Sequence, residues 1–359
     1  MNIRQTAGML LGAMSLMASA AGQAQVGMAQ LQVGAMPVTL SYPTATAVAP
    51  HSIGSFTLQV ALNATPSPGR FPLVVMSHGS GGSPVPDHAL ASTLVRAGFV
   101  VAQPLHHGNN HRDNSLAGPA TFPRRPGEAI QVIDALASHP QWAARLDLSR
   151  VGIHGMSAGG VTGLALAGAQ WRLLNLVRHC DRHTLDDEGF CFQGAMEPEA
   201  RAQRVSSFKS ARYWPELVLP SELKAVHGGR TPTSAQPDPR PDPRVAAVTL
   251  MVPVAAIFSA ESLSRIRIPV GQVSAQHDEV LVPRFHSDHV LRHCSTCTQL
   301  AELPQAGHFD VLWPWPADVA REVAGTQVRG GLPHPAFNPR EREAAHHRIA
   351  EFFRHNLAP

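Results

Sequence analysis

The sequence carries little charge and almost no lysine. Only 15% of its 359 residues are charged, and Lys209 and Lys224 are its sole lysines. Its positive charge therefore comes almost entirely from arginines, which are scattered along the chain without a dense basic run. Proteins that bind nucleic acid usually gather their basic residues into a patch or a stripe. The sequence therefore predicts no nucleic-acid partner.

Long apolar runs and phosphate-binding loops are also missing. No apolar run approaches the roughly 20 residues that a membrane-spanning helix needs. The chain contains glycine-rich segments but no G-x-x-x-x-G-K-[ST] motif, so a bound nucleotide is not expected. We expect a reaction that needs neither a cofactor nor a metal ion.

The N-terminus has the pattern of a secretory signal. Arg4 supplies a positive charge, a short run of small apolar residues follows, and residues 18–20 (ASA) fit the small-residue rule for cleavage. Residues 22–24 (GQA) offer a second cleavage site. We expect residues 1–24 to be a signal peptide and residues 25–359 to form a periplasmic or secreted domain. No cysteine lies near either cleavage site, so no stable membrane anchor is expected.

Only four cysteines are present, and an oxidising compartment favours their pairing as disulfides. Cys180 and Cys191 are close in sequence, as are Cys294 and Cys297, so local pairing is the simplest of three connectivities. The second pair forms a C-x-x-C motif, which also occurs in redox and zinc sites. No second C-x-x-C accompanies it, so we expect disulfides that hold loops in place.

The apolar pattern changes along the chain. Residues 30–33, 38–41 and 56–60 alternate apolar with polar residues, which is typical of antiparallel strands. Continuous apolar runs follow, as in strands buried on both faces, and they alternate with helical spacing. This alternation predicts a mostly parallel central sheet with helices on both faces. The expected buried strands cover residues 73–76, 99–102, 151–154, 245–250, 268–273 and 298–303, and helices cover residues 87–97 and 341–356.

The interval from about residue 171 to residue 244 interrupts this alternation. It is rich in His, Asp, Arg and Pro and contains the first cysteine pair. Its end, residues 237–244, has proline at every second position and can form neither a helix nor a central strand. We expect an insertion that forms a lid or one wall of a substrate pocket. A surface excursion with no role in binding is the alternative.

One segment carries the strongest chemical signal. Residues 155–160 (GMSAGG) follow the short β-branched run at residues 150–154 and precede a run of small residues. G-x-S-x-G between a strand and a helix is the pattern of a nucleophile elbow, in which the serine hydroxyl stands clear of a sharp turn. Gly155 and Gly159 suit this turn, because larger side chains there would collide. Ser157 is therefore the candidate nucleophile.

A serine hydroxyl needs a base, and the base needs an orienting group. The chain has 20 histidines, so position must select among them. His308 lies in a glycine-containing loop just beyond the last expected strand, where a base can reach Ser157. Asp278 follows the preceding strand and is the candidate acid, with Glu279 as its rival.

A second glycine-rich loop is a candidate for charge stabilisation. Residues 77–83 (SHGSGGS) follow a buried strand, and their glycines let backbone N–H groups turn toward a developing negative charge. We expect the amides of Ser80 and Ala158 to form an oxyanion hole, with Gly79 as the alternative to Ser80. His78 is expected to anchor this loop through hydrogen bonds.

Other histidines gather in two places. Residues 106–111 (HHGNNH) follow a buried strand and could line the pocket or bind a metal ion. His346, His347 and His355 lie among charged residues of the final helix and are expected on its solvated face.

Taken together, these motifs resemble those of α/β-hydrolases related to platelet-activating-factor acetylhydrolase and to predicted dienelactone-hydrolase-like enzymes. The resemblance rests on residues 77–82, on residues 151–168, on Asp278 and on residues 306–309. It implies an α/β-hydrolase fold with N-terminal antiparallel strands and a lid-like insertion.

The resemblance also implies a chemistry. Ser157, Asp278 and His308 would form a catalytic triad, and the amides of Ser80 and Ala158 would bind the oxyanion. On this basis we expect a secreted or periplasmic serine hydrolase that cleaves small-molecule carboxylic esters through an acyl-enzyme. A serine peptidase or amidase of the same fold is the alternative, and a catalytically silent binding protein is a second.

Overall fold

The computed structural model describes most of the chain. Residues 1–23, which make up nearly all of the expected signal peptide, lie outside the described residues, as do residues 194, 196 and 214–240 of the expected insertion. Within the described residues, no helix combines the length and the apolar character needed to cross a membrane. The described residues are 24–193, 195, 197–213, 241–312, 314–325 and 332–358.

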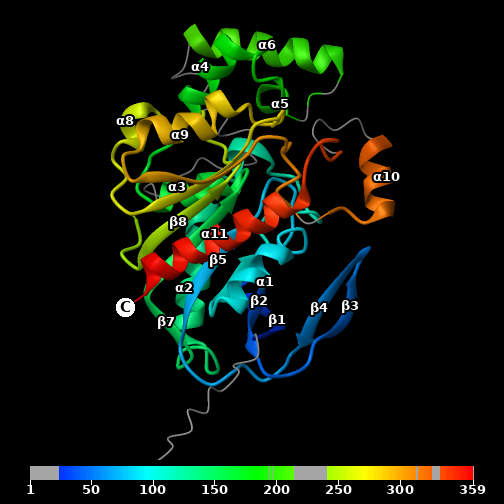
Figure 1. Cartoon of the computed structure of the whole chain (residues 1–359). Helices are drawn as coiled ribbons and strands as arrows, with labels where there is room; N and C mark the ends of the chain where they lie inside the picture. Colours follow the sequence, from blue (N-terminus) through cyan, green and yellow to red (C-terminus); the bar gives the residue numbers. More distant parts are fainter. Residues whose placement is uncertain are drawn as a thin grey trace, which may run out of the picture.

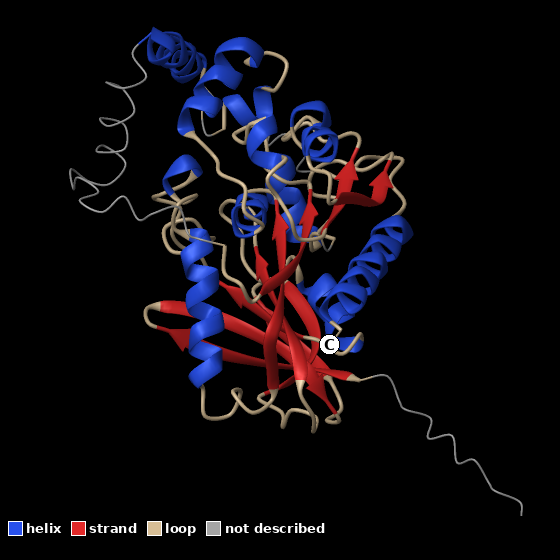
Figure 2. Ribbon diagram, turned by 90° about the vertical axis from the view of Figure 1, so that its left-hand side faces the viewer, coloured by secondary structure: helices blue, strands red, loops and turns tan. Residues whose placement is uncertain are grey.

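A ten-stranded mixed sheet forms the centre of the molecule (Figures 1 and 2). In space the strands follow the order β10-β9-β8-β7-β5-β6-β2-β1-β4-β3. The run from β10 to β6 is parallel throughout, and β2 joins it antiparallel to β6. The strands are β1 (Gln25–Val33), β2 (Met36–Thr44), β3 (Ala49–Ile53), β4 (Phe56–Leu62), β5 (Phe71–Ser77), β6 (Val100–Pro104), β7 (Leu146–Met156), β8 (Val245–Met251), β9 (Val270–Ala275) and β10 (Cys297–Leu303).

The strands expected from residues 73–76, 99–102, 151–154, 245–250, 268–273 and 298–303 are all present. All but the last are buried on both faces of the sheet; β10 lies at its edge, where Thr298, Gln299 and Glu302 are exposed. The N-terminal strands differ from expectation in two ways. β4 pairs with β1 in parallel, and β3 was not expected from the sequence. β3 lies at the edge of the sheet with most of its side chains at least partly exposed, so its residues show no apolar pattern.

Helices cover both faces of the sheet, which confirms the predicted fold class. One apolar core lies between the sheet and α2 and α3, and a second lies between the sheet and α1 and α11. Neighbouring residues of β5 contribute to opposite cores, Val75 to the first and Val74 to the second. The helices are α1 (His88–Arg96), α2 (Arg125–Ser138), α3 (Gly159–Leu166), α4 (Leu173–His183), α5 (Glu188–Cys191), α6 (Pro198–Tyr213), α8 (Ala260–Leu263), α9 (Ser287–His293), α10 (Ala317–Gly325) and α11 (Pro339–Leu357).

The final helix corrects one expectation. His347 and His355 are exposed, but His346 is buried. It lies beside Ala345, one turn before Ile349, on the face that packs against the sheet. Its neighbours in sequence are charged, but the helical spacing decides which face it occupies.

The insertion contributes α4, α5 and α6, which lie together at one end of the molecule (Figure 1). A disulfide between Cys180 and Cys191 joins α4 to α5, and a second links Cys294 to Cys297. The simplest of the three connectivities is therefore the one observed.

Candidate active site

Ser157 occupies the sharp turn between β7 and α3. Its φ of 54° is unusual for a residue other than glycine and marks a strained backbone. A Cβ atom on Gly155 would lie 2.2 Å from the carbonyl oxygen of Gly159. A Cβ atom on Gly159 would lie 1.8 Å from the carbonyl oxygen of Ser77 on β5. Glycine is therefore required on both sides of the serine by close backbone packing.

The loop after β10 brings His308 to this turn. Its Nε2 lies 3.0 Å from Ser157 Oγ, and its Nδ1 lies 2.7 Å from Asp278 Oδ2. All three side chains are buried. The carboxylate beside Nδ1 keeps the proton on that nitrogen, which leaves Nε2 free to accept the proton of the hydroxyl. The structure thus joins three residues that are widely separated in sequence.

Asp278 is held in place by the backbone of its own loop. Its Oδ1 accepts hydrogen bonds from the amides of Val280 at 2.9 Å and Leu281 at 2.7 Å. Glu279, the rival acid, is exposed. Asp310 accepts from the Gly307 amide at 2.7 Å and so braces the loop that carries His308.

The amides of Ser80 and Ala158 border the same cavity as Ser157. Within the described part of the chain, neither amide donates a hydrogen bond to a protein acceptor, and the Gly79 amide does not either. Ala158 also caps the N-terminus of α3, where backbone N–H groups carry partial positive charge. Unpaired amides beside a nucleophile can receive a developing oxyanion.

The cavity at Ser157 is small, about 20 Å³. Two of its walls come from the loop that follows β6 and from the loop that carries Asp278, and a third comes from the insertion. A void of this size holds little more than a water molecule or a methyl group. It is lined by Ser80, Gly118, Phe122, Ser157, Ala158, Gly189, Phe190, Gln193, Val254, Val280 and Leu281.

A larger cavity, of about 700 Å³, lies elsewhere, against β1, β2 and β4. His111 borders it, but Ser157, Asp278 and His308 do not. The larger cavity is therefore not the candidate active site. The smaller cavity is lined by Ser157, whose hydroxyl is aligned with the His308 imidazole and the Asp278 carboxylate, and we place the candidate active site there.

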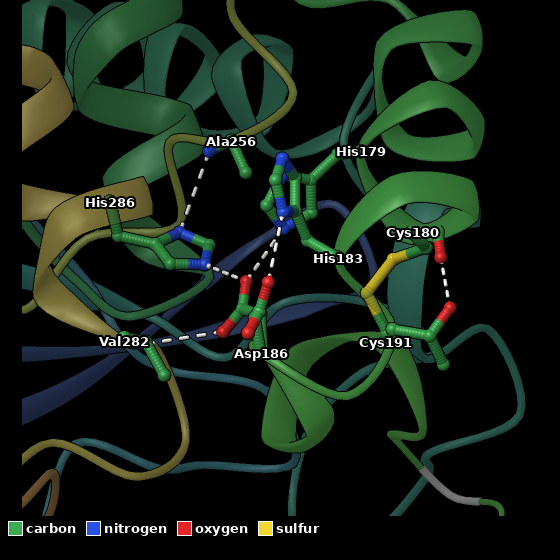
Figure 3. Close-up of a disulfide and its surroundings, with 10 residues drawn as sticks. His179, Cys180, His183, Asp186, Cys191, Ala256, Val282 and His286 are labelled. Atoms are coloured by element: carbon green, nitrogen blue, oxygen red, sulfur yellow. Dashed lines mark hydrogen bonds and ion pairs between the residues drawn. A yellow bond between two sulfur atoms is a disulfide. The ribbon is translucent and has the colours of Figure 1, made fainter.

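The buried carboxylate of Asp187 ties the insertion to the body of the protein through His179 and His286, both of which are labelled in Figure 3. Asp187 Oδ2 accepts from Nε2 of His179 at 2.8 Å and of His286 at 2.9 Å. Its Oδ1 accepts from the Val282 amide at 3.2 Å, in the loop that follows Asp278. Burial alone would raise the pKa of Asp187, but the hydrogen bonds from the two imidazoles outweigh it and hold the pKa below its ordinary value.

The same three residues are a possible metal-binding group among the described residues. However, His286 Nδ1 accepts a hydrogen bond from the Ala255 amide at 3.0 Å, so the proton of the neutral ring lies on Nε2. A metal ion would need the lone pair of Nε2 and a proton on Nδ1. The arrangement therefore fits a hydrogen-bonded clamp. We call His179, Asp187 and His286 the histidine clamp.

His106 also differs from expectation. It is fully buried and borders none of the cavities described above; its Nε2 lies 2.7 Å from Ser77 Oγ and its Nδ1 lies 2.7 Å from Glu128 Oε2. Both ring nitrogens are thus occupied, which leaves none for a metal ion. His78 behaves as predicted, because its Nδ1 donates to the Gly79 carbonyl at 2.7 Å and its Nε2 accepts from the His106 amide.

Comparison with known proteins agrees with this fold. Residues 39–131 match the family described as platelet-activating factor acetylhydrolase, isoform II. Ferulic acid esterase from Streptomyces cinnamoneus superposes with a TM-score of 0.55 at 16% identity, over 94% of this chain and 92% of the esterase. No curated protein sequence matches the chain.

Each comparison bears on a different part of the chain. The family match spans the loop at residues 77–83 but ends before Ser157. The structural match spans nearly the whole chain. Because its sequence identity is low, it is evidence for the fold alone. The chain therefore has the α/β-hydrolase fold and, over residues 39–131, resembles the platelet-activating factor acetylhydrolase family.

Proposed function

We propose that this protein is a serine hydrolase that cleaves carboxylic esters of small molecules. The observation that carries the proposal is the hydrogen-bonded line from Ser157 through His308 to Asp278, at 3.0 and 2.7 Å. Ser80 and Ala158 line the same cavity as Ser157, and their amides have no acceptor within the described residues. The family resemblance and the esterase fold support the same class of reaction.

The reaction follows from this geometry. His308 Nε2 takes the proton of Ser157 as Oγ attacks the ester carbonyl, and Asp278 stabilises the imidazolium that forms. The carbonyl oxygen becomes negative and receives hydrogen bonds from the amides of Ser80 and Ala158. His308 then gives its proton to the departing alcohol, which leaves an acyl group on Ser157. Water, deprotonated by His308, attacks the acyl-enzyme, and His308 returns that proton to Ser157 Oγ as the bond to the acyl group breaks and the acid is released.

The small cavity at the serine favours short acyl groups. With about 20 Å³ beside Ser157, an acetyl group fits more readily than a long chain. An amidase of the same fold would need the same triad. Turnover of a matched ester and amide therefore separates the two activities.

We further propose that the protein is exported. Two disulfides are the usual mark of an oxidising compartment, and the pattern of residues 1–24 is that of a cleaved leader.

The proposed activity is tested with p-nitrophenyl esters from acetate to palmitate. The wild-type protein should hydrolyse acetate with the highest kcat/KM, and Ser157→Ala should lose at least about 10⁴-fold in kcat. A fluorophosphonate probe should label the wild type and leave Ser157→Ala unlabelled. A folded wild-type protein that neither labels nor turns over any ester would refute the proposal.

A further inference from the structure

A guanidinium group lies buried behind the loop that carries Ser80. Arg125 is the first residue of α2, and its side chain is 0% exposed. It donates to the carbonyl oxygens of His78 and, at 3.3 Å, of Gly79. It also donates to Asn109, at 3.3 Å to the carbonyl and at 2.6 Å to Oδ1. All of these acceptors are oxygens of neutral groups.

These contacts help to fix the direction of two peptide units, and the Gly79 carbonyl is held further by His78 Nδ1 at 2.7 Å and by the Gly82 amide at 3.2 Å. All described peptide bonds are trans, so each C=O and the N–H of the next residue point to opposite sides. The carbonyls of His78 and Gly79 face Arg125, and the amides of Gly79 and Ser80 must therefore point away from it. A Cβ atom on Gly79 would lie 3.4 Å from Ser157 Cβ, and Ser80 borders the cavity at Ser157. The guanidinium thus helps to keep both amides on the side of the loop away from itself, and both residues lie close to Ser157.

Arg125 also acts on the loop through Asn109. The Asn109 Oδ1 atom accepts from Arg125, which directs its Nδ2 group toward Ser80 Oγ at 2.9 Å and Asn114 Oδ1 at 2.6 Å. The side chain of Ser80 is therefore held as well as its backbone.

Ser77, at the start of the same loop, is anchored through His106 by Glu128, which lies one turn after Arg125 on α2. Glu128 Oε2 lies 2.7 Å from His106 Nδ1, and His106 Nε2 lies 2.7 Å from Ser77 Oγ. The pattern imitates a catalytic triad, but Ser77 is 1% exposed and its hydroxyl also lies 2.9 Å from Thr162 Oγ1. No substrate can reach it, so this chain of hydrogen bonds is an anchor.

Holding a guanidinium here costs the fold energy. Burial lowers the pKa of Arg125 to about 9, and the nearby Glu128 carboxylate offsets only part of that cost. The desolvation of a buried charge offsets much of what its contacts contribute to stability. The position of the group is therefore better explained by the backbone that it orients than by stability.

We propose that Arg125 is a positioning residue for the oxyanion hole. It does not touch the substrate; it holds the Gly79 and Ser80 amides so that they meet the negative oxygen of the tetrahedral intermediate. The inference rests on the proposed role of Ser157 as the nucleophile. Because the oxyanion exists only in the transition state and in the intermediate, loss of this orientation lowers kcat and leaves KM nearly unchanged.

The test compares Arg125→Met and Arg125→Lys with the wild type on p-nitrophenyl acetate. Loss of one oxyanion donor costs about 10²–10³-fold in kcat, so we expect a fall of about 100-fold in Arg125→Met with KM within about threefold. Lysine keeps the charge but not the fork of donors, and we expect a fall of about tenfold. The inhibition constant of a trifluoromethyl ketone, whose hemiketal oxygen occupies the oxyanion position, should rise by the same factor as kcat falls.

Leu136→Ala is the matched control. Leu136 is 1% exposed on the same helix, and its side chain packs in the core away from the loop. This variant should lower the melting temperature and keep kcat and the inhibition constant of the wild type.

The inference is overturned if both arginine variants keep the wild-type kcat, or if kcat falls without a matching rise in the inhibition constant. It is also overturned if Leu136→Ala loses as much kcat as the arginine variants. Should Arg125→Met not fold, Arg125→Lys decides by the same two measurements. A wild-type protein that does not turn over esters would instead refute the proposed function, so the two failures are distinguishable.

Discussion

At the scale of single residues, the proposed chemistry depends on which nitrogen of His308 carries its proton. The Asp278 carboxylate holds that proton on Nδ1, and the amides of Val280 and Leu281 hold the carboxylate. The two oxygens of Asp278 and the two amides that hold them thus decide whether His308 Nε2 can act as a base. Glu279 lies in the same loop but is exposed.

The paired substitutions Asp278→Asn and Glu279→Gln test this assignment. An amide at position 278 can present N–H to the ring and favour the wrong tautomer, so kcat for p-nitrophenyl acetate should fall by about 10⁴-fold. Glu279→Gln should stay within about twofold of the wild type. Equal losses in the two variants would contradict the role given to Asp278.

At the scale of elements, α5 is the part of the insertion that bears on the site. Phe190 borders the cavity at Ser157, and its ring centroid lies 4.9 Å from that of His286 in the histidine clamp. Gly189 approaches the loop of Asp278 so closely that a Cβ atom would lie 2.3 Å from the Glu279 carbonyl. The clamp and the Cys180–Cys191 disulfide therefore hold one wall of the cavity.

Asp187→Asn should loosen that wall. An asparagine side chain has one acceptor oxygen in place of two, so it cannot accept from His179, His286 and Val282 as the carboxylate does. Phe190 can then move, and the ratio of kcat/KM for p-nitrophenyl butyrate to that for acetate should rise at least about fivefold.

The neighbouring substitution Asp186→Asn is the control. Asp186 is 53% exposed and pairs with His183 and Arg284 at the surface, away from the cavity. Its butyrate-to-acetate ratio should match that of the wild type. If the ratio does not change in Asp187→Asn, or changes equally in both variants, the histidine clamp does not control the choice of acyl group.

At the scale of the whole molecule, two apolar cores lie on opposite faces of one sheet. α1 and α11 both pack on the second core, where Phe99, between α1 and β6, lies 6.3 Å from Phe353 of α11 between ring centroids. Asp87 precedes α1 and is buried, and its Oδ1 has no hydrogen-bond partner in the described part of the chain. The fold therefore contains a carboxyl group that it stabilises poorly when ionised.

The stability of the whole fold should consequently depend on pH through Asp87. Burial raises its pKa from 3.8 to about 7, so the folded state keeps the proton that the unfolded chain releases between these values. The free energy of unfolding should therefore fall as pH rises from about 4 to about 7, by up to about 4 kcal/mol. Asp87→Asn removes this loss, and urea unfolding should find it more stable than the wild type at pH 8 and equally stable at pH 4.

Asp147→Asn is the comparison for that measurement. Hydrogen bonds from Ser149 hold the pKa of Asp147 below its ordinary value, so its ionised form is favoured in the folded state. This variant should gain no stability at pH 8. A gain of equal size in both variants would point to net charge as the cause.

Much of the site could be predicted from the sequence, because its signals are local. The G-x-S-x-G spacing marks the elbow, with the collision at Gly155 lying only four residues away at Gly159, and continuous apolar runs mark strands whose two faces are both buried. The chain order of Ser157, Asp278 and His308 follows from where each loop leaves its strand. Short separations likewise favoured the two disulfides.

The tertiary structure alone decided the role of several buried polar residues. Arg125 meets the carbonyl of His78 from 47 positions away, and Asp187 meets His286 from 99 positions away. Nothing beside these residues in sequence distinguishes them from exposed charges. Burial of a polar group is tolerated only when distant partners satisfy it, and such partners are brought together by the packing of the whole chain.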